Sequence, residues 1–386
     1  MSDKREIPFG RPWITEAERQ AVLGVLKNPI LTHGPKGREF EEAFSEMLGG
    51  GCYCVSTSSC MAALHLASFH FGFGQGDEVI VPAMTHVATA HAVEVVGARP
   101  VFVDCELETG NIDPAGIEAA ITPRTKAISL VHYLGIPCPM DEITSVVEKH
   151  GLILIEDCAL AVGTKYKGSS VALFGDVGCF SFYPVKHITT GEGGMFVTKH
   201  PEVARVAAKQ RAFGVDRKHD QRSRPGIYDV NMLGFNYRLS EVQAALGLVQ
   251  LKRMDEIQAR RRENFELLKG RLSALDRLHL LDVPNDRGLS SHYCLGVRLS
   301  SSLADRRDEV VDRLRSRGIG TSVYYPHPVP RLTYYRQRYG YDPEKFKNAA
   351  DLADNSIAFP VGPHLNPEDM EYMAREFRAV LDSLDI

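Results

Sequence analysis

The chain has 386 residues, 44% of them hydrophobic and 24% charged, which is the composition of an ordinary globular protein and excludes a disordered one. Its 45 basic and 49 acidic residues leave a formal net charge of only −4, which disfavours nucleic acid or anionic membranes as main partners. The polar N-terminus lacks the apolar core of a signal peptide, and no run reaches the roughly 18 apolar residues of a membrane span. We therefore expect a cytoplasmic protein.

Eight cysteines occur along the chain, several of them inside apolar runs. We expect buried free thiols in a reducing compartment. Cys52 and Cys54 are too close together for a C-x-x-C motif, and no H-E-x-x-H motif occurs. The sequence therefore predicts no metal site.

The stretch from residue 77 to 198 alternates short apolar runs with longer polar or mixed segments. This alternation predicts an α/β domain with a mostly parallel sheet. Two of the intervening segments, 86–96 and 140–150, are long enough to form crossover helices. The predicted strands are 77–82, 99–104, 126–132, 152–157, 177–182 and 194–198.

The pattern changes after residue 236. Residues 239–275 are highly charged, with apolar residues at three- and four-residue spacing, and this predicts a long helix that leaves the large domain. The remainder contains a helical pattern at 305–318, a strand-like run at 320–326 and a last helix at 368–384. We assign 1–250 to a large α/β domain and 251–386 to a smaller C-terminal α+β domain.

Lys186 lies in a turn between two apolar strands, just after Phe180, Phe182, Tyr183 and Pro184. Enclosure by these side chains would lower the pKa of its amine, as a lysine that forms a Schiff base requires. Taken alone, the same context also suits a solvated lysine in a surface turn.

Asp157 closes the apolar run 152–157, at the expected carboxyl end of a parallel strand, where open α/β sheets bind ligands. A carboxylate there could keep the ring nitrogen of pyridoxal phosphate (PLP) protonated. An aspartate that caps the next helix is an equally simple interpretation. Glu156 should point to the opposite face of the strand.

Residues 56–67 run from small hydroxyl side chains into an apolar helical pattern. The free N–H groups and the positive dipole end of such a helix start can bind phosphate. The signal is weak by itself, because serine and threonine begin most helices.

Together these elements resemble the DegT/StrS family of sugar aminotransferases, a branch of the PLP fold type I enzymes. The similarity extends over almost the whole chain and rests on several blocks that are hard to obtain together by chance. The blocks are 7–44, 76–93, 121–135, 156–168, 175–198 and 234–256.

The resemblance implies roles for individual residues. Lys186 stands at the position of the Schiff-base lysine ahead of G-E-G-G, and Asp157 at that of the partner of the pyridinium nitrogen. The remaining cofactor-binding positions are Ser181, Cys60 and Met61 for the phosphate, and His86 as the residue stacked on the cofactor ring. Either Asn236 or Arg238 would reach the phosphate from the neighbouring subunit, so the resemblance implies a homodimer with shared active sites.

Some positions depart from the family pattern. Met61 replaces a threonine that helps to hold phosphate, and His86 replaces a commoner Phe, Tyr or Trp. Leu160 stands where Gln or His usually bonds the ring oxygen of the cofactor, and Pro330 where many members carry a substrate-side histidine. Tyr325 and His327 lie close to Pro330 in sequence and are the candidate substrate contacts.

The resemblance implies a PLP-dependent aminotransferase that moves an amino group, with glutamate as donor, to a keto group of a nucleotide-linked deoxysugar. Some relatives are dehydratases with histidine at the lysine position; here the spacing to G-E-G-G assigns Lys186, and not His187, to that position. A keto-sugar without a nucleotide, a cyclitol ketone and a non-catalytic regulator of the same fold remain alternatives.

Overall fold

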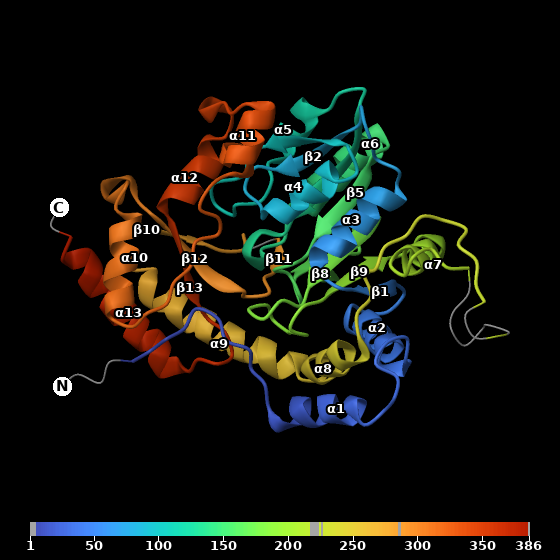
Figure 1. Cartoon of the computed structure of the whole chain (residues 1–386). Coiled ribbons are helices and arrows are strands. Elements are labelled where there is room, and N and C mark those ends of the chain that lie inside the picture. The colour runs from blue at the N-terminus through green and yellow to red at the C-terminus, as the bar shows by residue number, and fades with distance from the viewer. Residues whose placement is uncertain (1–4, 217–223, 225–226, 285–286, 385–386) are drawn as a thin grey trace.

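The structure, a computed structural model, describes residues 5–216, 224, 227–284 and 287–384. A large sheet covered by helices occupies the first half of the chain, and a smaller sheet with its own helices lies beside it (Figure 1). Within the described ranges, no helix is long and apolar enough to cross a membrane.

The large sheet has seven strands, and all six strands predicted from the sequence are confirmed as members of it. β9 runs antiparallel to both of its neighbours, β1 and β8, and the other neighbouring strands of the sheet are parallel to each other. The first strand, β1, was missed because its sequence, YCVST, is short and half polar. In spatial order the strands are β1 (Tyr53–Thr57), β9 (Gly194–Thr198), β8 (Val177–Ser181), β5 (Ile153–Asp157), β4 (Thr125–Val131), β2 (Glu78–Pro82) and β3 (Arg99–Val103).

Helices cover both faces of this sheet, because nearly all of its strands are apolar on both sides. On one face lie α3 (Cys60–His70), α4 (Val87–Glu94) and α7 (Pro201–Gln210). On the other lie α2 (Pro35–Met47), α5 (Pro114–Ala120), α6 (Met140–His150) and α8 (Glu241–Lys252), and α1 (Glu16–Leu26) packs against α8. Successive side chains of one strand therefore pack into the two different hydrophobic cores on the two faces of the sheet.

The smaller sheet has the order β10 (Leu278–Leu281), β12 (Cys294–Leu299) and β13 (Ser356–Pro360), all antiparallel. Its core is shared with α9 (Met254–Leu272), α10 (Arg307–Ser316) and α13 (Pro367–Asp382). Ile7, near the N-terminus, also packs into this core. The domain boundary near residue 250 stays a prediction.

Two details of the C-terminal half differ from the sequence-based expectation. The predicted helix 239–275 is two helices, α8 and α9, which meet at Arg253 in a non-helical conformation. The predicted strand 320–326 is wrong: within it only Ser322 forms an isolated bridge, with Ala358, and the residue before it, Ile319, forms another with Ile7. A run rich in β-branched and aromatic residues favours extended backbone, but pairing requires a neighbour along its whole length.

The remaining elements connect these two parts. A small three-stranded sheet joins β11 (Gly288–Leu289) to β6 (Lys165–Tyr166) and β7 (Ser169–Ser170). Helices α11 (Thr333–Tyr339) and α12 (Lys347–Asn355) precede β13. Single turns of 3-10 helix occur at Tyr133–Gly135, Ser301–Leu303, Val329–Arg331 and Pro343–Lys345.

Candidate active site

Lys186 lies in the turn that follows β8, where its backbone N–H donates a 2.9 Å hydrogen bond to the carbonyl of Tyr183. The side chain is half-buried, and Nζ lies 5.2 Å from the centre of the Tyr293 ring. Burial lowers the pKa of Lys186, although the nearby Cys60, Asp157 and Cys294 oppose that effect. Burial therefore shifts the pKa of this amine in the direction that the sequence analysis expected.

The surroundings of Lys186 differ from those predicted. Phe180 and Phe182 pack with Phe40 and Phe44 in the core beneath α2, and Tyr183 is exposed. The predicted enclosure by these residues is wrong, because in a strand and tight turn adjacent side chains point in different directions. Tyr293 contributes from the C-terminal half instead, and no local sequence pattern marks it.

Asp157 ends β5 and is buried, on the face of the sheet that carries α3 and α4. Its Oδ2 accepts a 2.8 Å hydrogen bond from the hydroxyl of Thr89, and its Oδ1 accepts a 3.0 Å bond from the backbone N–H of Ala159. The Cys60 thiol lies 3.8 Å from Oδ1. The carboxylate is thus fixed in one orientation, and Thr89 is a contact that sequence analysis did not identify.

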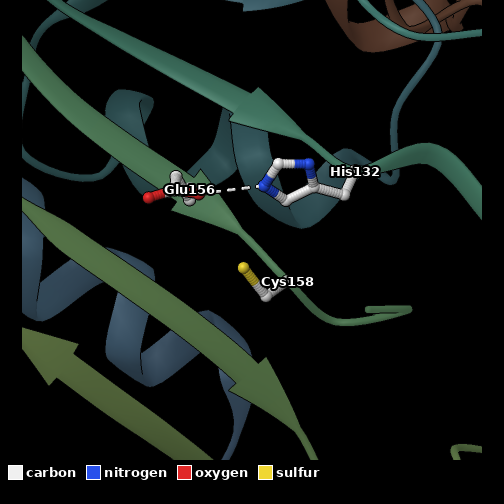
Figure 2. Close-up of side chains that lie close together, drawn as sticks. All are labelled: His132, Glu156 and Cys158. Atoms are coloured by element: carbon white, nitrogen blue, oxygen red, sulfur yellow. Dashed lines mark hydrogen bonds and ion pairs between the residues drawn. The ribbon is translucent and has the colours of Figure 1, made fainter. Parts of the chain in front are cut away.

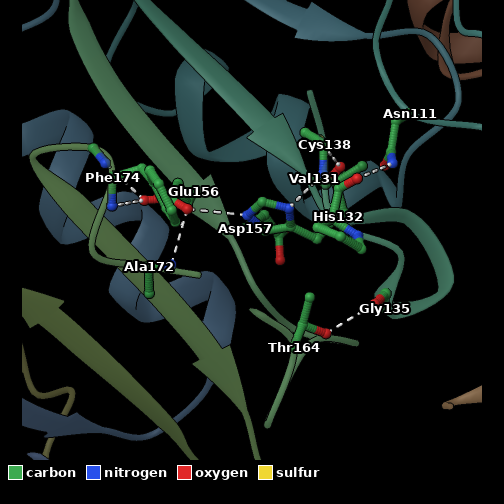
Figure 3. A network of polar contacts seen from close by, with 12 residues as sticks. Asn111, Val131, His132, Gly135, Cys138, Glu156, Asp157, Thr164, Ala172 and Phe174 are labelled. Carbon is green, nitrogen blue, oxygen red and sulfur yellow. Dashed lines mark hydrogen bonds and ion pairs between the residues drawn. The ribbon is translucent and has the colours of Figure 1, made fainter. Parts of the chain in front are cut away.

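Glu156 points to the opposite face, as predicted. Its Oε2 accepts bonds from His132 Nε2 at 3.0 Å and from the Ala172 N–H at 2.8 Å, and Oε1 accepts from the N–H groups of Phe174 at 3.0 Å and Gly175 at 2.7 Å (Figure 3). These hydrogen bonds connect the end of strand β4 and the 172–175 loop to Glu156, the residue that precedes Asp157.

His132, Glu156 and Cys158 lie close enough together to suggest a metal site (Figure 2). However, His132 Nδ1 accepts a 3.1 Å bond from the Cys138 N–H, so its proton is on Nε2 and is donated to Glu156. Neither ring nitrogen then has a free lone pair for a metal. Burial and the adjacent carboxylates raise the pKa of the Cys158 thiol and disfavour the thiolate that binds metals. The cluster is complete without an ion.

The start of α3 approaches the end of β8. Ser59 caps the helix by accepting a 3.1 Å bond from the Ala62 N–H, while the N–H groups of Cys60 and Met61, in the first turn, have no intrahelical acceptor. A Cβ atom at Gly194 would lie 2.6 Å from the Cys60 nitrogen, so the glycine allows this close approach. Ser181, paired with Gly194 across β8 and β9, is at the same edge.

His86 and Tyr325 lie on another wall of the site. His86 begins α4, where its Nδ1 accepts a 3.2 Å bond from the Ala88 N–H, and it is within electrostatic range of Asp157 and Lys186. The ring centres of His86 and Tyr325 are 5.6 Å apart. His327 is exposed and accepts a 2.8 Å bond from Arg331.

Two predicted residues lie further along the surface. Asn236 is exposed, whereas the Arg238 guanidinium lies 5.0 Å above the Phe213 ring, and its pKa is lowered by burial and by Arg211. Between them, the Tyr237 carbonyl accepts a 2.8 Å bond from the Ser58 N–H. The 236–238 segment therefore lies beside the start of α3 in its own chain.

Two of the four positions that depart from the family pattern, Leu160 and Pro330, are buried. Leu160 belongs to the core between the two sheets, and its carbonyl accepts a 2.7 Å bond from Ser291. Pro330 is buried in a 3-10 turn. Neither side chain supplies a polar group to the site.

The residues present fit PLP. A lysine with a lowered pKa, a buried carboxylate held by two donors, and helix N–H groups without an intrahelical acceptor beside a serine are the groups that an aldehyde, a pyridine nitrogen and a phosphate require. Their positions at the carboxyl ends of parallel strands follow the rule for open α/β sheets.

Comparisons with known proteins agree with this geometry. A family model described as the DegT/DnrJ/EryC1/StrS aminotransferase family matches residues 12–378. The spore coat polysaccharide biosynthesis protein SpsC of Bacillus subtilis is 36% identical over 395 aligned residues, which cover 100% of both chains.

Solved structures give the same result. PseC of Helicobacter pylori, an aminotransferase involved in the biosynthesis of pseudoaminic acid, superposes with a TM-score of 0.93 at 29% identity over 98% of this chain and 100% of its own. The PLP form of the putative sugar aminotransferase Spr1654 from Streptococcus pneumoniae gives a TM-score of 0.92 at 30% identity, over 98% and 99% of the two chains. The predicted fold, PLP fold type I, is confirmed.

Proposed function

Since the chain belongs to the DegT/DnrJ/EryC1/StrS aminotransferase family and is a PLP-dependent enzyme, we propose that it transfers the amino group of glutamate to a keto group of a nucleotide-linked deoxysugar. Two relatives support a sugar substrate: PseC acts in the biosynthesis of pseudoaminic acid, and SpsC in that of spore coat polysaccharide. An amino group placed on a keto-sugar would suit either kind of pathway.

The position of Lys186 is the observation that carries the proposal. Its half-buried amine has a lowered pKa and lies between the Asp157 side of the site and the Tyr293 ring. Bound PLP supplies an electron sink, provided that its ring nitrogen is protonated. Asp157 would hold that proton, and Lys186 Nζ would move a proton between substrate carbon and cofactor as the general base.

The phosphate of the cofactor would lie between Ser181 and the start of α3. The N–H groups of Cys60 and Met61 face no intrahelical acceptor, and the helix dipole favours an anion there. Met61 has no hydroxyl, so we propose that backbone N–H groups and Ser181 replace the threonine usual in the family.

We propose a homodimer in which Asn236 reaches the neighbouring active site, with Arg238 as the alternative contact. Asn236 lies next to a run of exposed apolar side chains, which a partner subunit would cover. This run comprises Phe213, Ile227, Val230 and Leu233.

The sugar would contact the aromatic wall that His86 and Tyr325 form, with His327 at the exposed rim. Aromatic faces suit the apolar faces of sugar rings, and a site bordered by polar groups at its rim can admit a long nucleotide-linked substrate. Pro330 is buried and offers no hydrogen bond, which is why we assign the polar contact to His327.

Dehydration is the second candidate reaction, because histidine replaces the anchor lysine in dehydratases of this family. Here His187 is buried, and its Nε2 donates a 3.1 Å bond to the Ser291 carbonyl, away from Asp157. This favours Lys186 as the reactive group and hence amino transfer. All eight cysteines are free thiols, which supports the cytoplasm as the site of action.

The test is the visible absorption of the purified protein with PLP, before and after glutamate, in the wild type, in Lys186→Ala and in the exposed-lysine control Lys199→Ala. We expect a yellow band that glutamate bleaches in the wild type and in the control, but not in Lys186→Ala. The bleached enzyme should then aminate a nucleoside-diphosphate-linked keto-sugar, detected by mass. Bleaching in Lys186→Ala, or a wild type indifferent to every amino donor, would contradict the proposal.

A further inference from the structure

Arg261, on α9, is a buried cation without an acidic partner. It is 5% exposed, and no carboxylate of the described chain forms an ion pair with it. Burial lowers the pKa of Arg261 to about 10, so the guanidinium is still charged at neutral pH. A buried charge without a counterion is unfavourable unless a ligand or a set of polar groups compensates it.

Only one edge of this guanidinium is used by the protein. Nη1 donates a 2.9 Å hydrogen bond to the Tyr293 carbonyl, whereas the buried Nε has no acceptor among the described residues. Nη2 likewise donates to no described residue. The Nε and Nη2 hydrogens point in parallel, and this is the edge that binds a carboxylate through two bonds.

Arg261 lines a pocket that also includes Val185, the residue before Lys186. Tyr293, His364 and Arg11 line it as well. The enclosed part of the pocket has room for about one water-sized group, whereas sites that bury a whole small molecule span roughly 300–1,000 Å³. It suits one functional group better than a sugar or a base.

The pocket is also close enough to the reactive amine to hold one end of an amino donor. Lys186 Nζ lies 5.2 Å and Arg261 Cζ 6.0 Å from the centre of the Tyr293 ring. Both distances are measured to the centre of the Tyr293 ring. Lys186 Nζ and Arg261 Cζ therefore lie no further apart than the sum of the two distances, about 11 Å. A ligand of the length of glutamate reaches both groups where their separation lies somewhat below that maximum.

The positive charge of the pocket comes from its arginines. His364 donates through Nε2 to the Pro8 carbonyl at 3.1 Å, its Nδ1 is buried without a partner, and burial lowers its pKa. The histidine is therefore neutral and shapes the wall, while Arg11 lies exposed at the rim. An anion entering from the rim would pass Arg11 first and then bind at Arg261.

We propose that the Nε and Nη2 edge of Arg261 binds a carboxylate of the amino donor. The inference rests on the proposed aminotransferase function and adds the residue that would recognise the donor. It predicts selectivity for acidic or α-carboxylate donors over simple amines, because an amine would leave the buried guanidinium without a counterion.

The experiment measures ligand binding and donor kinetics separately. Glutarate, a dicarboxylate without an amino group, and inorganic phosphate are each added to the PLP-loaded wild type, to Arg261→Lys and to Arg262→Lys, and the melting temperature is recorded. Arg262 is the exposed neighbour of Arg261 and the matched control. Bleaching of the PLP band is then followed against glutamate concentration.

We expect glutarate, but not phosphate, to raise the melting temperature of the wild type and of Arg262→Lys, and to have no effect on Arg261→Lys. The glutamate concentration for half-maximal bleaching should rise about tenfold or more in Arg261→Lys, with a much smaller change in the rate at saturation. Stabilisation by phosphate alone, or unchanged glutamate dependence, would overturn the inference. If the wild type never bleaches, the proposed function fails, while the glutarate result still decides whether the pocket binds a carboxylate.

Discussion

The hydroxyl of Thr89 donates a hydrogen bond of 2.8 Å to Oδ2 of Asp157, and both side chains are buried. The hydroxyl of Thr85, four residues earlier and just before α4, lies 2.8 Å from the hydroxyl of Thr89. If Thr89 gives its proton to Asp157, Thr85 must give its own to Thr89, so the two threonines form a chain that ends at the carboxylate. Thr89 then acts as a positioning residue for Asp157.

The Thr89→Val variant tests this role. The two side chains have nearly the same shape, but valine leaves Oδ2 without its donor, and a hydrogen bond to a charged group contributes about 1.5–3 kcal/mol. We expect PLP to bind roughly ten- to a hundredfold more weakly, as measured by titration of the visible band. Thr85→Val should have a smaller effect, because it removes only the second bond of the chain. Equal PLP affinity in all three proteins would exclude the role.

Glu156 should be essential for stability. Its two oxygens accept four hydrogen bonds inside the protein, and Glu156→Gln turns one oxygen into a donor that faces backbone N–H groups or His132. We expect the free energy of unfolding to fall by about 3 kcal/mol or more in urea denaturation.

The matched control for this change is Glu142→Gln on the exposed side of α6, where the free energy should change by less than about 0.5 kcal/mol. The hydrogen bonds of His132 also predict that zinc and chelators leave the melting temperature unchanged. Stabilisation by zinc that depends on His132 would show that the cluster does bind metal.

The large sheet could be predicted from the sequence because its strands are continuous apolar runs, and these are distinctive when both faces are buried. The break at Arg253 and the lack of a strand at 320–326 could not. Helical periodicity continues through α8 and α9, and strand pairing depends on distant neighbours such as Ala358.

Site prediction followed the same division. Lys186 and Asp157 could be proposed from the sequence because each ends or follows a recognisable strand. The roles of Cys60 and Ser181 were implied only by the family resemblance. Tyr293, which tertiary packing brings next to Lys186, carries no local signal, and neither does Arg261 of the proposed donor pocket. Their contribution follows only from the way the C-terminal half packs against the large sheet.

Lys186 should destabilise the PLP-free protein at neutral pH. Its pKa is lowered in the folded state, so between that value and the ordinary value of about 10.4 the unfolded chain binds more protons than the folded one. Stability therefore rises with pH in this interval. Each unit of lowering corresponds to about 1.4 kcal/mol at pH values below both pKa values.

The PLP-free Lys186→Met variant should accordingly melt at a higher temperature than the wild type at pH 7, and the difference should shrink as the pH approaches 10. Lys199→Met, on an exposed lysine, should show no such trend. A difference that stays constant with pH would mean that the effect comes from packing of the methionine and not from the charge.

Mixing two inactive variants tests whether Asn236 acts in its own active site or in that of a partner. Lys186→Ala removes the reactive amine, and Asn236→Ala removes the proposed phosphate contact. The structure places the backbone of the 236–238 segment beside Ser58 of the same chain, while the Asn236 side chain is exposed. Asn236 could therefore act in the active site of its own chain or in that of a partner, and the two cases predict different activities for a mixed dimer.

If Asn236 serves the partner's site, a hybrid dimer has one site with both defects and one complete site. Random reassociation of equal amounts makes half of the dimers hybrid, so roughly a quarter of the wild-type activity should return. If Asn236 serves its own chain, each site of the hybrid carries one defect and no activity returns. Mixing Lys186→Ala with Arg238→Ala decides in the same way whether Arg238 makes the contact. A mixture of equal amounts of Lys186→Ala and wild type should keep about half of the wild-type activity in either arrangement, and it is the control that the complete site of a hybrid dimer is active.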